Sequence, residues 1–464
     1  MKFGRARNIH LVGIGGSGMC GIAEVLINLR YSVSGSDVAA SETVKRLARL
    51  GGRIRTGHAP ENVHGADVVV TSTAIGEDNV EVVEARRRGI PVIPRAEMLA
   101  ELMRMKSGIA VAGTHGKTSV TSMVAQVLHL GHLDPTIVIG GRLAILGSSA
   151  KLGSGDLMVV EADESDGSFL ALRPRTAVIT NIDREHLDYH GTFEALVDAF
   201  VCFADSVPFY GQVVVCRDDP VLNRVLPRLK RRVVTYGLSQ KADLRATDLT
   251  FSGFASRFHV HTGGEDLGPM EIHAPGRHQV VNALAAVAVG LDCDLPFARI
   301  AAALESFEGA DRRFQMRGER GGILVIDDYG HHPTEIRATL AAAREGWHRP
   351  IVAVFQPHRY TRVRDLLDEF AASFEAAATV LVTDIYPAGE EAIPEVTAER
   401  VVEALRAAGH PDVRLVKNVD DVPGELLAVA RPGDLVMTLG AGSVTRVGEE
   451  LVKRLEQEDR EVRG

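Results

Sequence analysis

The chain has few cysteines, few aromatic residues and no long uninterrupted apolar segment. Its four cysteines among 464 residues are scattered and lack the close pairs of zinc or redox motifs, so we expect reduced thiols. No apolar run is long enough to span a bilayer, residues 280–291 being among the longest. The basic N-terminus runs at once into glycines, without the apolar segment of a signal peptide. We therefore expect a cytoplasmic protein without membrane insertion.

Positive charge is scarcer than negative charge. With 52 lysines and arginines against 61 aspartates and glutamates, the formal net charge is -9, which argues against a general affinity for nucleic acid or anionic membranes. Any anion-binding site must therefore be local. The remaining composition, with 45% apolar and 24% charged residues, is typical of a globular protein, and the length predicts about three domains.

The most informative stretch is residues 109–119, where an apolar run, a glycine-spaced turn and a helical pattern follow one another. The first N–H groups of such a helix can bind phosphate oxygens. Lys117 would add a charge for the outer phosphates, and the Thr118 hydroxyl is placed to ligate Mg²⁺. The spacing is shorter than the usual G-x-x-x-x-G-K-[ST], so an ordinary turn with an exposed lysine is the alternative. The predicted phosphate loop consists of Gly113, Thr114, His115, Gly116, Lys117, Thr118 and Ser119.

A second glycine-rich turn, at residues 13–18, follows the apolar run at residues 9–12. It has the pattern G-x-G-x-x-G, and a helical pattern and a second apolar run, ending near Asp37, come after it. An acidic residue at this distance suits a ribose hydroxyl. The fingerprint fits NAD, FAD and UDP-sugars equally, and a tight turn that binds nothing is the alternative. Residues 72–75 follow a later strand, where ligands of parallel sheets bind.

Two strand ends in the middle of the chain carry candidate metal ligands. Glu161 follows the apolar run at residues 157–160 and is our first choice for a nucleotide-bound Mg²⁺, with an acidic solvated turn as the alternative. His186 lies among carboxylates after another strand, where either a metal ligand or a plain surface histidine fits. Asn282, in the first turn of an apolar helix, matches the donor and acceptor of an adenine edge, or caps the helix.

The last third of the chain has polar residues after four predicted strands. They are residues 327–333, 356–362, 384–390 and 440–443. Because the carboxyl ends of parallel strands share one edge of a sheet, these residues predict a further functional edge. Short alternating runs between residues 242 and 273 predict a small antiparallel sheet. We place domain boundaries near residues 106 and 312, in an α/β protein.

Taken together, these motifs resemble those of the Mur ligase family over essentially the whole chain. The stretches that carry the resemblance are IHLVGIGGSGMCGIAEVL, AGTHGKTS, EADESDGSFL, TNIDREHLDYH, DDYGHHPTEI, FQPHRYTR and DIYPAGE. The resemblance implies a Rossmann-like UDP-sugar-binding domain at residues 1–106 and a central P-loop ATP-binding domain, which includes the small sheet, at residues 107–312. A Rossmann-like amino-acid-binding domain would then occupy residues 313–464.

The resemblance implies an ATP-dependent ligase of peptidoglycan precursor synthesis. ATP would phosphorylate the lactyl carboxylate of UDP-N-acetylmuramate, and the amine of L-alanine would attack the acyl phosphate to form an amide. Members that add later residues commonly use a carbamylated lysine near a second metal ion. The chain has no lysine between His186 and Lys230, which favours the alanine-adding branch. We expect a monomer or weak homodimer whose domains close on the substrates.

The resemblance also implies roles for individual residues. Lys117 would hold the β and γ phosphates, Thr118 and Glu161 would bind one Mg²⁺, and His186 with Glu161 a second. Asn282 would bind the adenine, with His278 close by. Arg313 and Arg312 would contact the phosphates, and Asp328 would help to complete the closed site. The UDP-sugar would contact Gly15, Ser17, Gly18, Asp37 and Ser72, and alanine would contact Tyr329, His331, Arg359 and Arg362. Two positions depart from the family pattern, Gln279 where asparagine is usual and Glu185 where aspartate is usual.

Three other interpretations stay open from the sequence. A murein peptide ligase would attach a whole tripeptide to the same sugar nucleotide, but its first glycine loop usually departs from the G-I-G-G-S-G-M found here. A nicotinamide-dependent oxidoreductase fits the first glycine loop and leaves Lys117 and Glu161 unexplained. A non-catalytic nucleotide-binding regulator would bind the same ligands and form no product.

Overall fold

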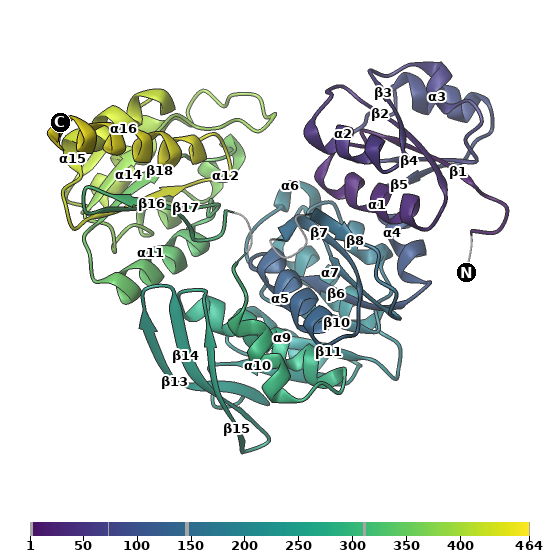
Figure 1. Cartoon of the computed structure of the whole chain (residues 1–464), viewed down its shortest axis with the longest axis horizontal. Helices are drawn as coiled ribbons and strands as arrows, with labels where there is room; N and C mark the ends of the chain where they lie inside the picture. Colours follow the sequence, from purple (N-terminus) through teal and green to yellow (C-terminus); the bar gives the residue numbers. More distant parts are fainter. Residues whose placement is uncertain (1–2, 73, 144–147, 310–311, 464) are drawn as a thin grey trace. The chain divides into compact units, whose positions relative to one another are not determined.

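The structure is a computed structural model of the chain, and Figure 1 labels its helices and strands. It describes residues 3–463 except 73, 144–147 and 310–311, and at residues 17, 141–143, 148–149 and 458–463 it describes the backbone alone. The chain forms two compact units. The first comprises Met1–Thr247, His259–Gly268 and Val281–Ala310, and the second comprises Asp248–Phe258, Pro269–Val280 and Asp311–Gly464. The three domain ranges stay a prediction.

The N-terminal sheet is parallel, with its first strand in the middle. In the order β3-β2-β1-β4-β5, its strands are β3 (Arg53–Thr56), β2 (Ser32–Asp37), β1 (Asn8–Val12), β4 (Val68–Thr71) and β5 (Val92–Pro94). Strand β1 is buried along nearly its whole length, which suits a parallel sheet covered by helices on both faces. From β1 the strand order runs through β2 and β3 on one side and through β4 and β5 on the other. Parallel sheets of this kind bind ligands where the strand order reverses in this way, outside the carboxyl ends of the strands.

Helices connect the strands of this sheet. They are α1 (Ser17–Asn28), α2 (Glu42–Arg49), α3 (Val80–Arg87) and α4 (Arg95–Met103). The side chains of Ser41 and Asn79 cap α2 and α3 by accepting backbone N–H groups, whereas α1 begins after Gly16, which has no side chain to do so. The two methionines of α4, Met98 and Met103, are buried and belong to the core.

A second sheet has the order β15-β14-β13-β12-β11-β10-β6-β9-β7-β8. Its strands are β6 (Ser107–Ala112), β7 (Thr136–Leu143), β8 (Ser148–Lys151), β9 (Leu157–Glu161), β10 (Thr176–Ile179), β11 (Gln212–Cys216), β12 (Val233–Gly237), β13 (Leu244–Ser252), β14 (Ala255–Thr262) and β15 (Glu265–Ile272). The helices around it are α5 (Lys117–Leu130), α6 (Leu187–His190), α7 (Phe193–Asp205), α8 (Pro220–Val225), α9 (Arg277–Asp292) and α10 (Phe297–Glu305). We predicted a small antiparallel sheet between residues 242 and 273, appended to the α/β core. The strands of this segment, β13–β15, form one end of the second sheet, where β13 pairs in parallel with β12.

The position of α5 follows from its sequence. Its residues 119–128 are all buried, because apolar and small side chains cover every face of the helix. It packs on β7 and β9, and also on α10. Strand β6 pairs in parallel with β9 and with β10, so the residues that follow these three strands meet at one edge of the sheet, where α5 begins.

The second unit contains a sheet in the order β16-β17-β21-β18-β19-β20. Its strands are β16 (Gln315–Arg320), β17 (Ile323–Asp328), β18 (Ile351–Phe355), β19 (Thr379–Val382), β20 (Val413–Leu415) and β21 (Leu435–Leu439). The helices are α11 (Pro333–Trp347), α12 (Tyr360–Asp365), α13 (Leu367–Ala371), α14 (Ala398–Ala407), α15 (Val422–Val429) and α16 (Thr445–Arg463). Strand β16 pairs antiparallel to β17, and the other pairings are parallel.

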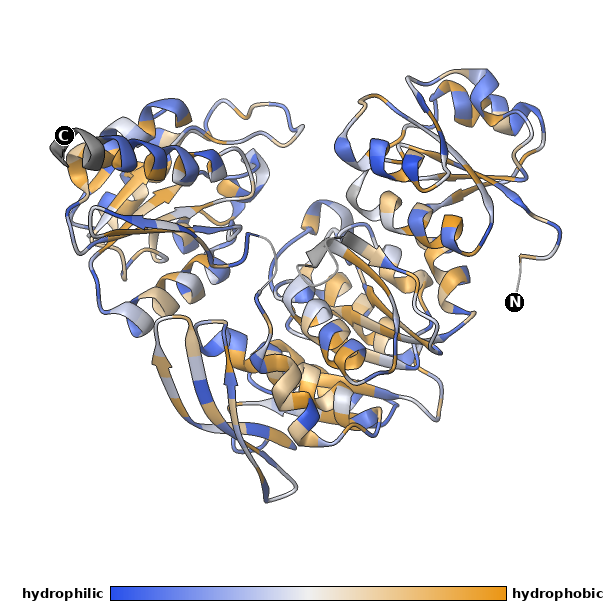
Figure 2. Ribbon diagram, viewed as in Figure 1, coloured by the Kyte–Doolittle hydropathy of each residue, from blue (hydrophilic) through white to orange (hydrophobic). Residues whose placement is uncertain are grey.

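Hydrophobic residues concentrate on the strands. Figure 2 colours the inner strands of each sheet as hydrophobic, whereas the helices present mixed surfaces. In the second unit, alternate residues of β18 belong to two separate hydrophobic clusters, because Ala353 faces one cluster while Val352 and Val354 face the other. These features confirm the predicted α/β class. Within the described residues, no helix is both long and apolar enough to cross a membrane.

Candidate functional site

The predicted phosphate loop lies between β6 and α5, at the edge where β9 and β10 also end. Gly113 and Gly116 have φ values of 132° and 82°, which favour glycine. A Cβ on Gly113 would collide with Thr180 Oγ1, and one on Gly116 would lie 2.9 Å from Asn282 Oδ1. The glycines therefore set the backbone path and allow close packing at both ends of the turn.

The segment that follows β10 holds this loop in place. Asn181 Oδ1 accepts the N–H of His115 at 2.8 Å, and Asn181 Nδ2 donates to the carbonyl of His115 at 2.9 Å. Thr180 Oγ1 donates to the same carbonyl at 2.6 Å, and the N–H of Asp183 donates to Thr114 Oγ1 at 2.9 Å. His115 Nε2 lies 3.0 Å from Asp183 Oδ2. The loop is thus fixed before any ligand binds, which favours tight binding.

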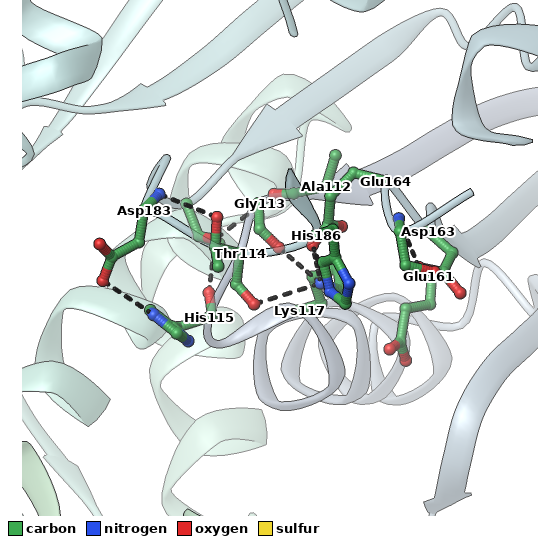
Figure 3. Close-up of polar contacts among 12 residues, drawn as sticks. Ala112, Gly113, Thr114, His115, Lys117, Glu161, Asp163, Glu164, Asp183 and His186 are labelled. Carbon is green, nitrogen blue, oxygen red and sulfur yellow. Dashed lines mark hydrogen bonds and ion pairs between the residues drawn. The ribbon is translucent and has the colours of Figure 1, made fainter. Parts of the chain in front are cut away.

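Lys117 lies against the loop with 15% of its side chain exposed, and Figure 3 shows its polar contacts. Its Nζ donates to the carbonyls of Gly113 and Thr114, at 2.7 and 3.2 Å, and to Glu164 Oε1 at 2.7 Å. Burial lowers the pKa of Lys117, but the nearby carboxylates, Glu164 first, raise it more, so the amine stays charged. Burial raises the pKa of Glu164 to about 7, against the opposing effect of Lys117.

Sequence reasoning missed Glu164, because it chose the first carboxylate of the run at residues 161–166. Glu164 is fully buried, and its Oε2 has no hydrogen-bond partner among the described residues. In its ionised form it supplies the negative charge next to Lys117 that the phosphates of a nucleotide would otherwise supply. Which carboxylate of the run turns toward the loop depends on the turn after β9, where the N–H of Gly167 donates to the carbonyl of Glu164.

The predicted Mg²⁺ ligands Thr118 and Glu161 are in contact. Thr118 Oγ1 donates to Glu161 Oε1 at 3.0 Å, and the N–H of Gly140 donates to Glu161 Oε2 at 2.9 Å. A hydroxyl beside a carboxylate is the oxygen donor set that Mg²⁺ prefers, so these residues fit the ion. The structure brings the third predicted ligand, His186, toward a different carboxylate, because its Nε2 lies 3.9 Å from Glu164 Oε1. The pairing of His186 with Glu161 stays a prediction.

Two other residues predicted to bind the nucleotide lie close to the loop. Ser119 is in the first turn of α5 and is buried, so its backbone is better placed than its hydroxyl to meet a phosphate. Asn282 lies on α9 with its amide against Gly116, next to the N-terminus of α5. Its predicted contact with adenine is untested.

The side chain of Asp37 holds the glycine loop after β1 in place by hydrogen bonds. Asp37 Oδ2 accepts the N–H of Gly15 at 2.8 Å, and Oδ1 accepts the N–H of Ala39 at 3.1 Å. The carboxylate, which we expected to face a ribose, therefore also fixes the loop. Ser72 lies just after β4, on the same edge of the sheet. Ser17 begins α1, and its side chain lies outside the described part of the chain.

An arginine that the sequence did not single out lies over this loop. The guanidinium of Arg95, the first residue of α4, occupies the space that a Cβ on Gly18 would need, and its Nη2 is 4.0 Å from Asp163 Oδ2. A cation at the N-terminus of α1 suits a diphosphate. The sequence did not indicate a role for Arg95, because it follows Pro94 near the predicted domain boundary, where the pattern indicates only helix packing.

In the second unit, the ring of Tyr329 contacts two predicted phosphate-binding arginines. The guanidinium carbons of Arg312 and Arg313 are each 5.0 Å from the centre of its ring. Arg312 also donates to the carbonyl of Gly440 at 2.6 Å, and Arg313 Nη1 is 3.6 Å from Glu335 Oε1. These contacts tie Arg312 to the sheet, so its predicted role at the phosphates needs a rearrangement of its side chain.

His278 and Asp328, also in the second unit, have shifted pKa values. Burial, with a smaller contribution from Arg313, lowers the pKa of His278 to about 4, so its ring is neutral at pH 7. Burial also raises the pKa of Asp328. Its Oδ2 accepts the N–H of Phe314 and its Oδ1 that of Gly330, each at 2.8 Å. Asp328 thus holds together the two loops that carry Arg313 and Tyr329.

The residues predicted to bind alanine lie after β17 and β18, near Tyr386, which follows β19. The ring of His331 lies 5.5 Å from that of His358, which stacks on Tyr386 at 5.5 Å. Arg362 is buried and donates to the carbonyl of His358 at 3.0 Å. Arg359 has a φ of 68°, and its buried Nε has no hydrogen-bond partner among the described residues. Sequence reasoning quoted the stretches containing His358 and Tyr386 but assigned them no role.

Comparisons with known proteins match nearly the whole length of the chain. Residues 8–107 match the Mur ligase family, catalytic domain; residues 111–290 match the Mur ligase middle domain; and residues 312–442 match the Mur ligase, glutamate ligase domain. The UDP-N-acetylmuramate--L-alanine ligases of Trichlorobacter lovleyi and Geobacter sulfurreducens are each 56% identical to the chain. Each match covers 98% of the chain, and 100% and 99% of the two relatives respectively.

Solved structures of two related enzymes have the same fold. A UDP-N-acetylmuramate-alanine ligase from Thermotoga maritima is 28% identical with a TM-score of 0.81, and the match covers 97% of the chain and 99% of that protein. A murein peptide ligase from Psychrobacter arcticus is 26% identical with a TM-score of 0.70, covering 97% and 98%.

Proposed function

The chain belongs to the Mur ligase family, and from this premise we propose that it joins L-alanine to UDP-N-acetylmuramate at the expense of ATP. The amide forms between the lactyl carboxylate of the sugar nucleotide and the amine of alanine, in the synthesis of peptidoglycan precursors. The observation that carries the proposal is the identity of 56% to alanine ligases over 98% of the chain, joined to a complete phosphate loop in the structure.

The reaction needs ATP because a carboxylate is a poor electrophile. Transfer of the γ-phosphoryl group to the lactyl carboxylate gives an acyl phosphate, whose phosphate is a good leaving group. The neutral amine of alanine then attacks the carbonyl carbon, and the tetrahedral intermediate collapses to amide and phosphate. The protein mainly positions these reactants and neutralises developing charge.

In this proposal the phosphate loop binds the β and γ phosphates. The N–H groups at the start of α5 meet the phosphate oxygens, and Lys117 leaves Glu164 to contact them. Thr118 and Glu161 hold a Mg²⁺, and Glu161 with His186 holds a second. When bound, the ions neutralise phosphate charge. Asn282 and His278 contact the adenine. Arg313 and Arg312 contact the phosphates. Asp328 stabilises the loop that carries Arg313, because it accepts the N–H of Phe314.

Alanine binding is proposed for the second unit. The buried Nε of Arg359, which has no hydrogen-bond partner among the described residues, supports a role in binding an anion such as the carboxylate of alanine. Arg362, Tyr329 and His331 complete this site, and the diphosphate of the sugar nucleotide binds the loop containing Gly15, Ser17 and Gly18. The free cysteines among the described residues and the use of ATP suit the cytoplasm. We propose a monomer or weak homodimer.

The experiment that tests this function is phosphate release from ATP with Mg²⁺ and UDP-N-acetylmuramate, with and without L-alanine. We expect release that depends on alanine, together with a mass increase of one alanyl residue on the sugar nucleotide. A murein peptide ligase is the second candidate, since the structure from Psychrobacter arcticus has the same fold. Activity with a tripeptide but not with alanine would favour it, and inactivity with both would contradict a ligase of either kind.

A further inference from the structure

The turn between α7 and β11 exposes two neighbouring aromatic side chains. The N–H of Gly211 donates to the carbonyl of Pro208 at 2.9 Å, which closes a β-turn with Phe209 and Tyr210 at its two central positions. Phe209 is 91% exposed and Tyr210 is 68% exposed. Turns are usually built from glycine, proline, asparagine, aspartate and serine. Because the turn itself does not need aromatic rings, their joint exposure indicates a contact outside the chain.

This aromatic turn, residues 208–211, keeps its shape without a partner. Gly211 has to be a glycine, because a Cβ there would lie 2.1 Å from the carbonyl oxygen of Arg175. The N–H of Gln212 donates to the same carbonyl at 3.1 Å. The rings of Phe209 and Tyr210 contact each other edge to face, with their centres 5.3 Å apart. Since the rings are already held in place, burying them in a partner costs little conformational entropy.

Two basic segments lie beside the aromatic turn, because all three segments precede neighbouring strands. Residues 173–175 precede β10 and residues 228–232 precede β12, and both strands pair in parallel with β11. Arg231 Nε donates to the carbonyl of Val207 at 2.6 Å, so the second segment contacts the start of the turn. The amino ends of these strands therefore bring positive charge to both sides of the two rings.

Several cations of these segments form no ion pair in the described part of the chain. We call them the basic rim, and they are Arg173, Lys230, Arg231 and Arg232. Where the guanidinium groups of the rim form hydrogen bonds, the acceptors are backbone carbonyls. By contrast, Arg175 and Arg228 in the same segments pair with aspartates. Asp205 contacts the rim through the backbone N–H of Lys230. In a chain whose net charge is -9, the rim is a local excess of positive charge.

We propose that this face attaches the protein peripherally to an anionic bilayer, with Phe209 and Tyr210 at the level of the head groups and the basic rim on the lipid phosphates. An apolar ring beside a phenol fits the boundary between acyl chains and head groups, where aromatic side chains are enriched. Lysines and arginines around the rings are attracted to anionic lipids. Apolar area and positive charge at one level add up to reversible surface binding.

A bilayer explains this surface better than a single-stranded nucleic acid does. A nucleic acid would also contact cations and aromatic rings, but it stacks its bases on open ring faces. Here the edge of one ring lies against the face of the other, at an interplanar angle of 89°. A bilayer needs only apolar area beside positive charge. The inference goes beyond the proposed function and does not depend on it, because the phosphate loop follows the opposite, carboxyl ends of strands in the same sheet.

The test is co-sedimentation of the full chain with vesicles of phosphatidylcholine containing about one third phosphatidylglycerol, and with vesicles of phosphatidylcholine alone. We expect the wild type to bind the anionic vesicles at low ionic strength, at least about thirtyfold more tightly than the neutral ones, and to dissociate as salt is added. Phe209→Ser combined with Tyr210→Ser should weaken binding to the anionic vesicles about tenfold or more, because the apolar area is lost. Lys230→Gln combined with Arg232→Gln should weaken it about thirtyfold.

Two control variants change similar side chains elsewhere. Val83→Ser removes an aliphatic side chain that is 52% exposed on α3. Arg55→Gln combined with Arg337→Gln removes the same amount of charge from two exposed arginines outside the rim. Both controls should bind the anionic vesicles nearly as the wild type does. Thermal unfolding should be close to that of the wild type for every variant, since each substitution is at an exposed position.

The outcomes separate attachment to a bilayer from the other interpretations. A wild type that does not bind anionic vesicles, or binds neutral vesicles equally well, would overturn the inference. Equal binding by the wild type and the Phe209→Ser, Tyr210→Ser variant would overturn it as well. Tighter binding of a single-stranded oligonucleotide than of the vesicles, lost in the same variants, would replace it with a nucleic-acid surface. A chain that ligates alanine without binding vesicles would contradict this inference alone, and one that binds vesicles without ligating alanine would contradict only the proposed function.

Discussion

At the scale of single residues, the environment of Lys117 explains how the phosphate loop stays intact without a ligand. Its ammonium group satisfies two loop carbonyls and neutralises the buried Glu164. Removing one partner of such a buried pair leaves an uncompensated charge, which costs several kcal/mol. Lys117 therefore supports both the folded loop and, in the proposed function, the phosphates.

We predict that Lys117→Ala lowers alanine-dependent phosphate release by a factor of about a thousand or more, because the phosphates lose their buried cation. UDP binding, measured by calorimetry, should stay close to that of the wild type, since it belongs to the N-terminal sheet. Lys151→Ala is the control, because Lys151 pairs with Asp134, outside the loop. Substantial ligase activity in Lys117→Ala would refute the assignment of the loop.

Glu81 gives a pH prediction at the same scale. Its pKa falls from the ordinary 4.5 to about 2, despite burial, because hydrogen bonds stabilise the ionised form, so ionisation contributes roughly 3 kcal/mol to the free energy of unfolding at pH 7. For a lowered pKa, this contribution is complete above pH 4.5 and is lost as the pH falls from 4.5 toward 2.

We expect Glu81→Gln to destabilise the protein at pH 7, since the amide donates where Ser36 and Asn62 need an acceptor. The free energy of unfolding, measured with denaturant between pH 3 and pH 7, should be lower for the variant than for the wild type. This difference should become smaller as the pH falls toward 3. Glu42→Gln, at a surface pair with Lys45, should have little effect at any pH. If the loss in free energy of unfolding caused by Glu81→Gln did not depend on pH, this result would contradict the lowered pKa of Glu81.

At the scale of elements, the phosphate loop depends on where β6, β9 and β10 end. Because these strands pair in parallel, Glu161 and the segment at residues 180–183 come to the loop without any long side chain reaching across the sheet. The turn itself depends on Gly116, whose φ of 82° places it in the left-handed region just before α5.

We predict that Gly116→Ala costs about 1–2 kcal/mol of stability from the left-handed backbone and also weakens ATP binding about tenfold, because its Cβ would displace Asn282. Gly89→Ala is the matched control, since Gly89 has a φ of 69° and a Cβ there would meet nothing within 4 Å. It should show a similar loss of stability with normal ATP affinity. Equal ATP binding by both variants would contradict the role of the turn.

At the scale of the whole molecule, the proposed reaction draws on both compact units. The phosphate loop belongs to the first unit, and the proposed alanine residues, such as Arg359, belong to the second. All reactants must meet at one carbonyl carbon, so both units must contact the same set of substrates.

We therefore expect small-angle X-ray scattering to show a smaller radius of gyration when UDP-N-acetylmuramate and a non-hydrolysable ATP analogue are both bound. Each nucleotide alone serves as the control and should produce a smaller change or none. An unchanged radius with both ligands bound would count against closure of the units on the substrates.

Much of the fold could be predicted from the sequence, because local signals are strong where strands meet glycine turns. The strands predicted to precede residues 356–362 and 440–443 are β18 and β21, which end at Phe355 and Leu439 as expected. The sequence did not predict β3, where exposed polar residues alternate with one apolar residue. It predicted the sheet formed by β13–β15 but not the strand beside which this sheet joins the core, because strand order along a sheet is not encoded in any single segment.

The sequence by itself determined the residues of the phosphate loop, the carboxylate Glu161 and the glycine loop at residues 13–18, because each lies within a short motif whose spacing is set by backbone geometry. Only the tertiary structure decided that Glu164 neutralises Lys117, that Arg95 covers Gly18 and that Glu81 orients His58. These contacts join segments that are far apart in the chain. Packing of helices and parallel strands brings them together, and no local pattern specifies that packing.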